Sequence, residues 1–430
     1  MASYLSRTFG TATSTKKFTV SLWVKGTLSS GIILQYGNDY LHFNNNSIDF
    51  EPSIGRLRTN RLFRDPASWF HIMVVCDTTL STADDRFKIY VNGVQETSFA
   101  SRINPSVNAD FTGFNTAVVH KIGQRQASPA NDLNYTDLMT HFHFVDGLAL
   151  TPTTFGESDS VSGIWKPKTA PSISEYGVNG FFLKFENSGA MGTDSSGKGN
   201  NFTVSGTITQ NVDTPSNNFA TINPLDNYHQ GSIFSNGNNT FLTADVSTTY
   251  NTSSIMVNAG KWYVECKVVS GGATTDIGIV GEMADATVGE IKAKEFGYSY
   301  VSNGEFGNNG SASSYGSSYA NGDIIGIALD CTNNKLYFSK NGTFQDSGNP
   351  SAGSGGKTIT APASTPIGNY AFAGGDKNSD VKTFSFNFGN GYFGTTVVAS
   401  AGTSPSGGGI FEYDCPSGYQ ALCTKGLNSF

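Results

Sequence analysis

Charged residues and cysteines are scarce in this sequence of 430 residues. Asp, Glu, Lys and Arg make up 14 % of it, about half of the usual share in a globular protein. Long apolar runs are missing as well. None approaches the roughly 20 residues that a membrane-spanning helix needs, and the first residues lack the apolar segment of a signal peptide. We therefore expect a chain that is made in a reducing cytosol and is not inserted into a membrane.

Basic residues gather in one place only. Arg56, Arg58, Arg61 and Arg64 form the single dense basic stretch of a chain whose net charge is −7. A surface that binds phosphates needs many clustered Lys and Arg side chains. Nucleic acid is therefore not expected as a partner.

The five cysteines are odd in number and show no CxxC spacing, which predicts neither a disulfide framework nor a zinc knuckle. Cys76, Cys266 and Cys331 lie in apolar strand patterns and are expected in cores. Cys415 and Cys423 could pair with each other, an alternative that the sequence leaves open.

Glycine and aromatic residues are abundant instead. The chain has 50 Gly, and aromatics make up 12 %, a composition unlike that of disordered segments or coiled coils. Apolar and polar residues alternate in several runs, as in strands with one buried face. The clearest rows are Phe18, Val20, Leu22 and Val24; Trp262, Val264, Cys266 and Val268; and Phe384, Phe386 and Phe388. Asn-Gly steps, which favour tight turns, occur at eight places. The pattern predicts an all-β chain.

Composition shifts divide the chain into two antiparallel β-sandwich domains of jelly-roll type, joined by an irregular connector. We expect the first sandwich at residues 1–165, the connector at 166–235, the second sandwich at 236–396 and a Gly/Ser-rich tail at 397–430. Helical periodicity is nearly absent, and its best candidate is 285–296.

The first segment carries five short motifs in a characteristic order. They are the runs at 18–24, 69–74, 88–93, 121–123 and 142–147, which include SLWVK, a W-x-H strand and a YVNG hairpin. Together they resemble a LamG-like domain of the concanavalin A-like superfamily over about 150 residues. The resemblance implies a jelly-roll sandwich, and such domains sometimes hold Ca²⁺ on their loops.

The second segment carries a more specific pair of motifs. GDIIGIALD at 322–330 is followed by KLYFSKNG at 335–342, and GKWYVE at 260–265 precedes them. These residues resemble a SPRY domain. The resemblance implies a bent β-sandwich that binds partners through its loops.

The remaining stretches are similar to parts of bacteriophage virion proteins. Residues 176–185, 194–200, 213–219 and 223–225 resemble connectors in such proteins, and 411–424 resembles short segments of tail and fibre proteins. The resemblance implies a structural protein of the virion, made in the host cytoplasm, with lectin-like modules.

Aromatic residues in a Gly/Ser-rich stretch are the candidate ligand contacts. Phe306, Tyr315 and Tyr319 lie within 302–321, and aromatic side chains on polar loops can stack on sugar rings or anchor a protein. The alternative is that they fold back onto the sandwich or are buried against another subunit.

Calcium is the metal that the loops could hold. Asp132, Asn134 and Asp137 lie in one predicted loop, and Asp39 and Asn44 in another. Hard oxygen ligands suit Ca²⁺, although Asn and Asp are also common in turns for local hydrogen bonding. No cofactor is expected.

Catalytic patterns are weak. A retaining glycosidase needs two carboxyl groups about 5 Å apart, and no strand carries closely spaced acids that would supply them. His141 and His143 alternate on a strand without an evident third metal ligand, and His71 lies in a framework strand. We therefore expect a non-enzymatic protein, with polysaccharide depolymerase as a remote alternative.

The resulting hypothesis is a virion surface protein, in a fibre, in the tail or decorating the capsid. Its loops would contact host-surface polysaccharide or protein, and it would form a homo-oligomer beside other virion proteins. The alternative is a purely structural adaptor that binds other virion proteins and no host ligand.

Overall fold

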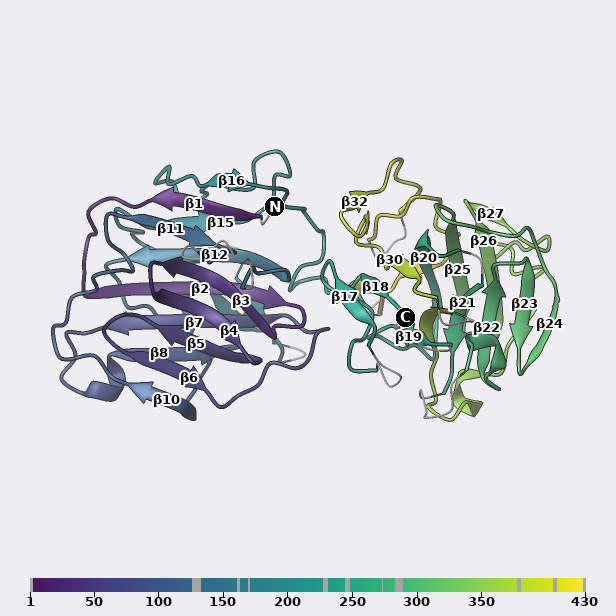
Figure 1. Cartoon of the computed structure of the whole chain (residues 1–430), viewed down its shortest axis with the longest axis horizontal. Helices are drawn as coiled ribbons and strands as arrows, with labels where there is room; N and C mark the ends of the chain where they lie inside the picture. Colours follow the sequence, from purple (N-terminus) through teal and green to yellow (C-terminus); the bar gives the residue numbers. More distant parts are fainter. Residues whose placement is uncertain are drawn as a thin grey trace. The chain divides into compact units, whose positions relative to one another are not determined.

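The computed structural model describes residues 3–125, 133–160, 163–168, 171–226, 231–243, 248–272, 274–282, 289–376, 380–404 and 408–427. The chain forms two compact units, which are Met1–Gln210 (unit 1) and Asn211–Phe430 (unit 2). Both consist of antiparallel sheets with short turns (Figure 1). The all-β prediction is confirmed.

Unit 1 contains two large sheets. The first has the order β10 (Phe99–Ile103), β6 (Arg56–Thr59), β5 (Ser47–Glu51), β4 (Asp39–Asn44), β3 (Ser30–Tyr36), β11 (Val119–Ile122), β1 (Tyr4–Thr8) and β16 (Thr203–Ser205). The second has the order β15 (Phe181–Leu183), β12 (Leu138–Asp146), β2 (Lys17–Lys25), β7 (Phe70–Asp77), β8 (Phe87–Val91) and β9 (Val94–Gln95).

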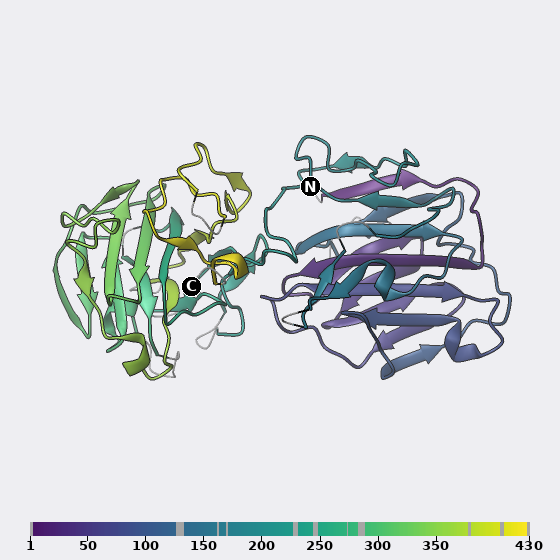
Figure 2. The ribbon, with the colours of Figure 1, turned by 180° about the vertical axis from the view of Figure 1, so that it is seen from behind.

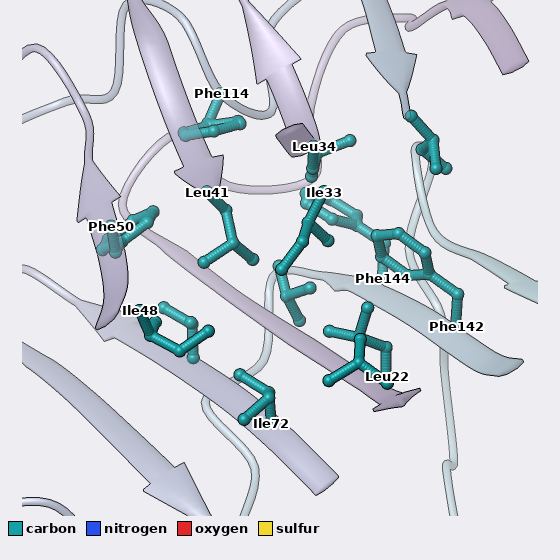
Figure 3. Close-up of a cluster of buried hydrophobic side chains, with 14 of the residues drawn as sticks. Leu22, Ile33, Leu34, Leu41, Ile48, Phe50, Ile72, Phe114, Phe142 and Phe144 are labelled. Atoms are coloured by element: carbon teal, nitrogen blue, oxygen red, sulfur yellow. The ribbon is translucent and has the colours of Figure 1, made fainter. Parts of the chain in front are cut away.

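The core of unit 1 lies between these sheets. Leu22 of β2 and Ile72 of β7 come from one sheet, and Leu41 of β4 and Phe50 of β5 come from the other. Figure 3 shows these side chains directed into the same apolar space. Because side chains alternate along a strand, every second residue of β4 and β5 points to the opposite, outer face.

A covering segment closes the outer face of the second sheet (Figure 2). It contains the 3₁₀ turn Pro152–Thr154 and the hairpin β13 (Gly156–Ser158) with β14 (Trp165–Pro167). Phe155 packs against Met73, Val75 and Val145 there. A further 3₁₀ turn, Ala83–Asp85, precedes β8.

Unit 2 is also built from two large sheets. One has the order β17 (Ile233–Ser235), β18 (Thr240–Leu242), β30 (Thr383–Asn387), β20 (Lys261–Ser270), β25 (Ile324–Asp330), β26 (Lys335–Lys340) and β27 (Thr343–Phe344), with β28 (Lys357–Thr358) on β26 and β33 (Gln420–Ala421) parallel to β20. The other has the order β19 (Tyr250–Thr252), β29 (Ala371–Asp376), β21 (Thr275–Val280), β22 (Gly297–Val301), β23 (Glu305–Asn308) and β24 (Ser311–Ser314).

The smaller elements of unit 2 complete it. They are the hairpin β31 (Tyr392–Phe393) with β32 (Thr396–Val397), the 3₁₀ turns Ile291–Ala293 and Pro362–Ser364, and α1 (Thr424–Leu427). The helix expected at 285–296 is present only as the first of these 3₁₀ turns, and 283–288 lie outside the described residues. No helix in the described ranges has the length and apolar character to cross a membrane.

The units differ in extent from the four segments expected from the sequence. The stretch 166–235 is divided between them, because β15 and β16 join the sheets of unit 1 while Phe219 and Ile222 are buried in unit 2. The tail is not merely a flexible end: Phe411 and Tyr419 are buried. Glycine and serine dominate the composition of this tail, so the composition does not reveal the few large residues that pack.

Cys415 and Cys423 are both free thiols in buried positions, so the pairing left open by the sequence does not occur in the structure. Both pack in one apolar cluster with Phe411 and Tyr419. Cys76, Cys266 and Cys331 are also buried and free, as expected.

Candidate functional site

The aromatic stretch at 302–321 is part of the unit 2 core. Tyr315 and Tyr319 are only 6 % and 4 % exposed. The Tyr315 hydroxyl accepts a hydrogen bond from the backbone N–H of Phe338, and the Tyr319 hydroxyl donates to the carbonyl of Tyr300 at 2.8 Å. The prediction of exposed ligand contacts is corrected here: these tyrosines fold back onto the sandwich, which was the alternative.

Phe306 is half-buried and lies in the same aromatic group. The Lys357 ammonium lies over it, 5.7 Å from the ring centroid, and 5.3 Å from the centroid of Tyr315. A cation above two aromatic rings is a stabilising contact. Tyr315 and Tyr319 are thus buried, and Phe306 is half-buried beside them.

The predicted calcium loop is used for another purpose. Asp132 lies outside the described residues. The Asp137 carboxylate accepts hydrogen bonds from the backbone N–H groups of Thr27 and Leu28, and burial raises its pKa. Asn134 lies beside Gly31 of β3. Asp137 thus fixes the turn before β3, in which Leu28 has a φ of 47°.

Asp39 and Asn44 do not share a loop, because they are the first and last residues of β4. The Asp39 carboxylate accepts hydrogen bonds from the N–H groups of Ser53 at 2.8 Å and Phe114 at 3.1 Å. Both donors are loop backbone groups, so Asp39 has a structural role.

The histidines of the second sheet are packed side chains. His71 lies 2.8 Å from the Ser21 hydroxyl through Nε2 and accepts a hydrogen bond from the Trp165 indole at Nδ1. Since Nδ1 accepts, Nε2 carries the proton and donates to Ser21. Burial lowers the pKa of His71 to about 3. His71 therefore does not activate Ser21 as a nucleophile.

His143 is buried. Its Nδ1 lies 2.8 Å from the Tyr176 hydroxyl, and its ring stacks on Phe182. His141 sits at a bulge of β12 with a φ of 49°. Neither belongs to a metal-ligating group among the described residues.

A polar group that the sequence did not single out lies on the outer face of the first sheet of unit 1. A two-residue turn at Asn45 and Asn46, both with positive φ, joins β4 to β5. This turn sets His42 opposite Asp49, and Asp49 opposite Arg58 on β6. We call the outward residues Tyr40, His42, Asp49, Glu51, Arg56 and Arg58, together with Arg125, the β4–β6 face.

Asp49 is the centre of the β4–β6 face. Its carboxylate is fully buried and accepts two hydrogen bonds from Arg56, with Nε at 3.0 Å and Nη2 at 2.6 Å. Arg56 also contacts Glu51 at 3.3 Å, and Arg58 Nε lies 4.0 Å from Asp49. This two-pronged pairing fixes Arg56 in one orientation.

His42 has no such partner. Its side chain is 9 % exposed, and within the ranges that the structure describes neither ring nitrogen makes a hydrogen bond. Its Nε2 lies 3.8 Å from Asp49, and burial lowers its pKa. A buried polar group without a partner costs about 1–3 kcal/mol and calls for a functional explanation.

Arg125 completes the β4–β6 face. It follows β11, and its guanidinium carbon lies 5.7 Å from the centroid of the Tyr40 ring. Its Nε also lacks a hydrogen-bond partner among the described residues. Buried nitrogens that make no hydrogen bond among the described residues thus lie on β4 and just after β11. Both side chains contact the partly exposed ring of Tyr40.

One chemistry is excluded at this face. His42, Asp49 and Glu51 have donor atoms within 4.8 Å of one another, as a metal site requires. However, the Arg56 guanidinium bonds to both carboxylates. A cation already fills the place of the metal, and Arg58 adds a second positive charge beside it.

The sequence did contain a signal for this face. The run YLHFNNNSIDFE at 40–51 alternates strictly on both sides of an Asn pair. A two-residue turn there pairs 42 with 49, and the arginines at 56 and 58 alternate in the same way. In the sequence alone, the spacing of these arginines does not show that they pair with carboxylates on a neighbouring strand.

Three comparisons place the chain among known proteins. No curated protein matches it. Among solved structures it is similar to the SPRY domain of human HERC1, with 17 % identity, a TM-score of 0.29 and coverage of 36 % of this chain and 92 % of that one. It is also similar to a candidate carbohydrate-binding protein from Bacteroides ovatus, with 15 % identity, a TM-score of 0.36 and coverage of 47 % and 56 %.

These identities and TM-scores describe a likeness of fold alone. The family comparison is more specific, because its match covers β20 to β27, including both hairpin motifs that resemble the family in the sequence. Residues 261–349, within unit 2, match the SPRY domain family.

Proposed function

We propose that this chain is a non-catalytic structural protein on the surface of a bacteriophage virion, and that it contacts host-surface polysaccharide through the β4–β6 face. The observation that carries the proposal is the partly exposed Tyr40 ring beside His42 and the fixed pair of Asp49 and Arg56. Fixed polar groups beside an aromatic ring suit a sugar, which presents hydroxyl groups at its rim and C–H groups on its face.

A virion can bind a surface through many weak contacts, because it carries many copies of one protein. Contacts through a few partly exposed side chains give modest affinity, and repeated copies on one particle raise it through effective concentration. A homo-oligomer next to other virion proteins would supply those copies. The setting is supported by the resemblance to virion segments of residues 176–185, 194–200, 213–219, 223–225 and 411–424.

The test is a glycan array probed with the full-length protein and two variants. Tyr40→Ala should weaken binding at least tenfold because it removes the only ring proposed to stack on the sugar. Tyr4→Ala is the matched control: Tyr4 lies on β1 of the same sheet and also lies beneath a cation, Lys121 at 4.4 Å. The control should bind like the unmodified protein.

Other results would favour other functions. Equal binding by Tyr40→Ala and the unmodified protein would exclude the β4–β6 face. A protein that binds no glycan, but associates with virion proteins through its SPRY segment, would be the structural adaptor. Shortened polysaccharide chains after incubation would indicate a depolymerase.

A further inference from the structure

The charges of the β4–β6 face point to the kind of sugar that it takes. Three arginines, Arg56, Arg58 and Arg125, face two carboxylates, Asp49 and Glu51. One positive charge is therefore in excess on this face, although the whole chain has a net charge of −7. Such a local reversal of sign favours an anionic ligand.

The three arginines are not equivalent. Arg56 gives two of its N–H groups to Asp49 and contacts Glu51 with a third nitrogen. Arg58 donates to the carbonyl of Asn44 at 3.3 Å and lies 4.0 Å from Asp49, so it is held less tightly. Its side chain is 28 % exposed, which leaves it accessible to a ligand.

The group around Arg58 matches a carboxylate on a sugar ring. A guanidinium pairs with a carboxylate through two parallel hydrogen bonds. Both ring nitrogens of His42 are buried, so His42 is assigned no direct contact with the sugar. Tyr40 offers the ring face on which the sugar can stack.

We propose that the β4–β6 face recognises a uronate, a sugar unit that carries a carboxylate, with Arg58 binding the carboxylate and Tyr40 contacting the sugar ring. The inference rests on the proposed polysaccharide-binding function and specifies its ligand class. A phosphate group is the competing anion, and it lacks the ring that would contact Tyr40.

The experiment compares two forms of one ligand. Isothermal titration of the full-length protein with oligogalacturonate should show binding, and the fully methyl-esterified oligomer should bind at least tenfold more weakly, because esterification removes the charge and keeps the sugar. In NMR spectra, the imidazole signal that is missing in His42→Gln should shift when oligogalacturonate is added.

Matched arginine variants locate the contact. Arg58→Gln should weaken oligogalacturonate binding at least tenfold and should reduce the preference over the ester to less than threefold. Arg102→Gln is the control, because Arg102 lies on the neighbouring strand β10, is 25 % exposed and pairs with Asp84. It should bind like the unmodified protein, and circular dichroism should show both variants folded.

The outcomes separate the two proposals. Equal binding of both oligomers, reduced by Tyr40→Ala, would overturn the uronate assignment and leave polysaccharide binding intact. Binding of neither oligomer, together with an empty glycan array, would overturn both. Displacement of oligogalacturonate by equimolar inorganic phosphate would mark a general anion site and would also overturn the uronate assignment.

Discussion

Both units are antiparallel sandwiches that bury carboxyl groups, but among the described residues only unit 1 also buries histidines. Unit 1 buries histidines: His71, His120 and His143 lie in its interior, with their pKa values lowered by burial, to about 3 for His71 and about 4 for His120. Unit 2 buries carboxyl groups. Burial raises the pKa of Glu265 and Asp276 to about 7 and that of Asp376 to about 6.

The carboxyl groups of unit 2 tie distant segments together. Glu265 on β20 accepts hydrogen bonds from the backbone N–H groups of Glu412 and Tyr413 at 2.8 and 2.9 Å. Asp376 accepts one from Thr249. In unit 1 the histidines pack against aromatic rings instead, as His120 does on Phe9. Two units of the same fold class should therefore depend on pH in opposite directions.

The largest expected effect is an opposite response to pH. In the folded protein His71 and His120 stay neutral, whereas in the unfolded chain they take up protons below pH 6.5. Unit 1 therefore loses stability as the pH falls toward 4. At pH 4.5 the free energy of unfolding is reduced by about 2.7 kcal/mol for each of these histidines. Asp39 and Asp137, whose pKa values are raised, reduce this loss in part.

Unit 2 should respond in the other direction. Its folded carboxyl groups keep protons that the unfolded chain has lost, so its stability falls as the pH rises from about 4.5 to 7. Glu265 alone should lower the free energy of unfolding of unit 2 by about 3 kcal/mol over this pH range. Peptide-resolved hydrogen exchange, expressed as protection factors at pH 5 and 7.5, measures both units in one sample.

Single variants sharpen this comparison. Glu265→Gln should flatten the pH response of unit 2 alone, and His71→Gln should do so for unit 1. If both units lost protection in the same direction, the contrast between buried histidines and buried carboxyl groups would not govern their stability.

The second prediction concerns the separate cores. Phe18→Ala should destabilise unit 1, and Phe386→Ala should destabilise unit 2, each by about 3–5 kcal/mol, the usual cost of removing a buried phenylalanine ring. Phe18 lies 4.7 Å from Phe111 between ring centroids, and Phe386 lies 5.4 Å from Phe388. Each cluster of buried apolar residues in the described chain belongs to one unit only.

Pulse proteolysis in urea, followed by mass spectrometry of the fragments, reads each unit separately. Each variant should lower the urea midpoint of its own unit and leave the other unchanged. A Phe18→Ala protein in which both midpoints fell together would show that the units unfold as one.

Alternation and turns were readable from the sequence because they are local. The row from Phe18 to Val24 lies in β2, and the hairpins at Asn92-Gly93 and Asn341-Gly342 occur where predicted. Asn309-Gly310, another of the eight Asn-Gly steps, joins β23 to β24, but β24 has no strand pattern in the sequence. Its sequence, SASS, has no bulky residue and forms a fully exposed edge strand, which looks like a loop.

The site depended on pairings that local patterns do not specify. Small polar residues surround Tyr315 and Tyr319 in the sequence, which favours exposure, but in the structure both pack against Tyr300 and are buried. Conversely, His42 became a candidate only once the register set it beside Asp49, and Arg125 came to Tyr40 from a distant part of the chain.

The smallest expected effect tests a feature that the units share. The backbone N–H of Asn92 donates to the carbonyl of His71, and its Oδ1 accepts from the N–H of the same residue. Asn341 makes the same two bonds to Ile324. Both asparagines have φ near 48°, which favours Asn and Gly.

Asn92→Ala and Asn341→Ala should therefore destabilise their units by similar amounts, about 1–2 kcal/mol each, because each loses one acceptor and strains one positive φ. Asn341→Ala should cost slightly more, because Asn341 also donates through Nδ2 to the partly exposed Asp323 carboxylate at 2.7 Å. The Asn→Gly variants relieve the strain and keep only the loss of the acceptor, so they should cost about half as much. Urea midpoints from pulse proteolysis measure all four. A cost in one unit only would mean that the two hairpins, alike in geometry, differ in what holds them, and that the surrounding packing rather than the turn closes one of the sandwiches.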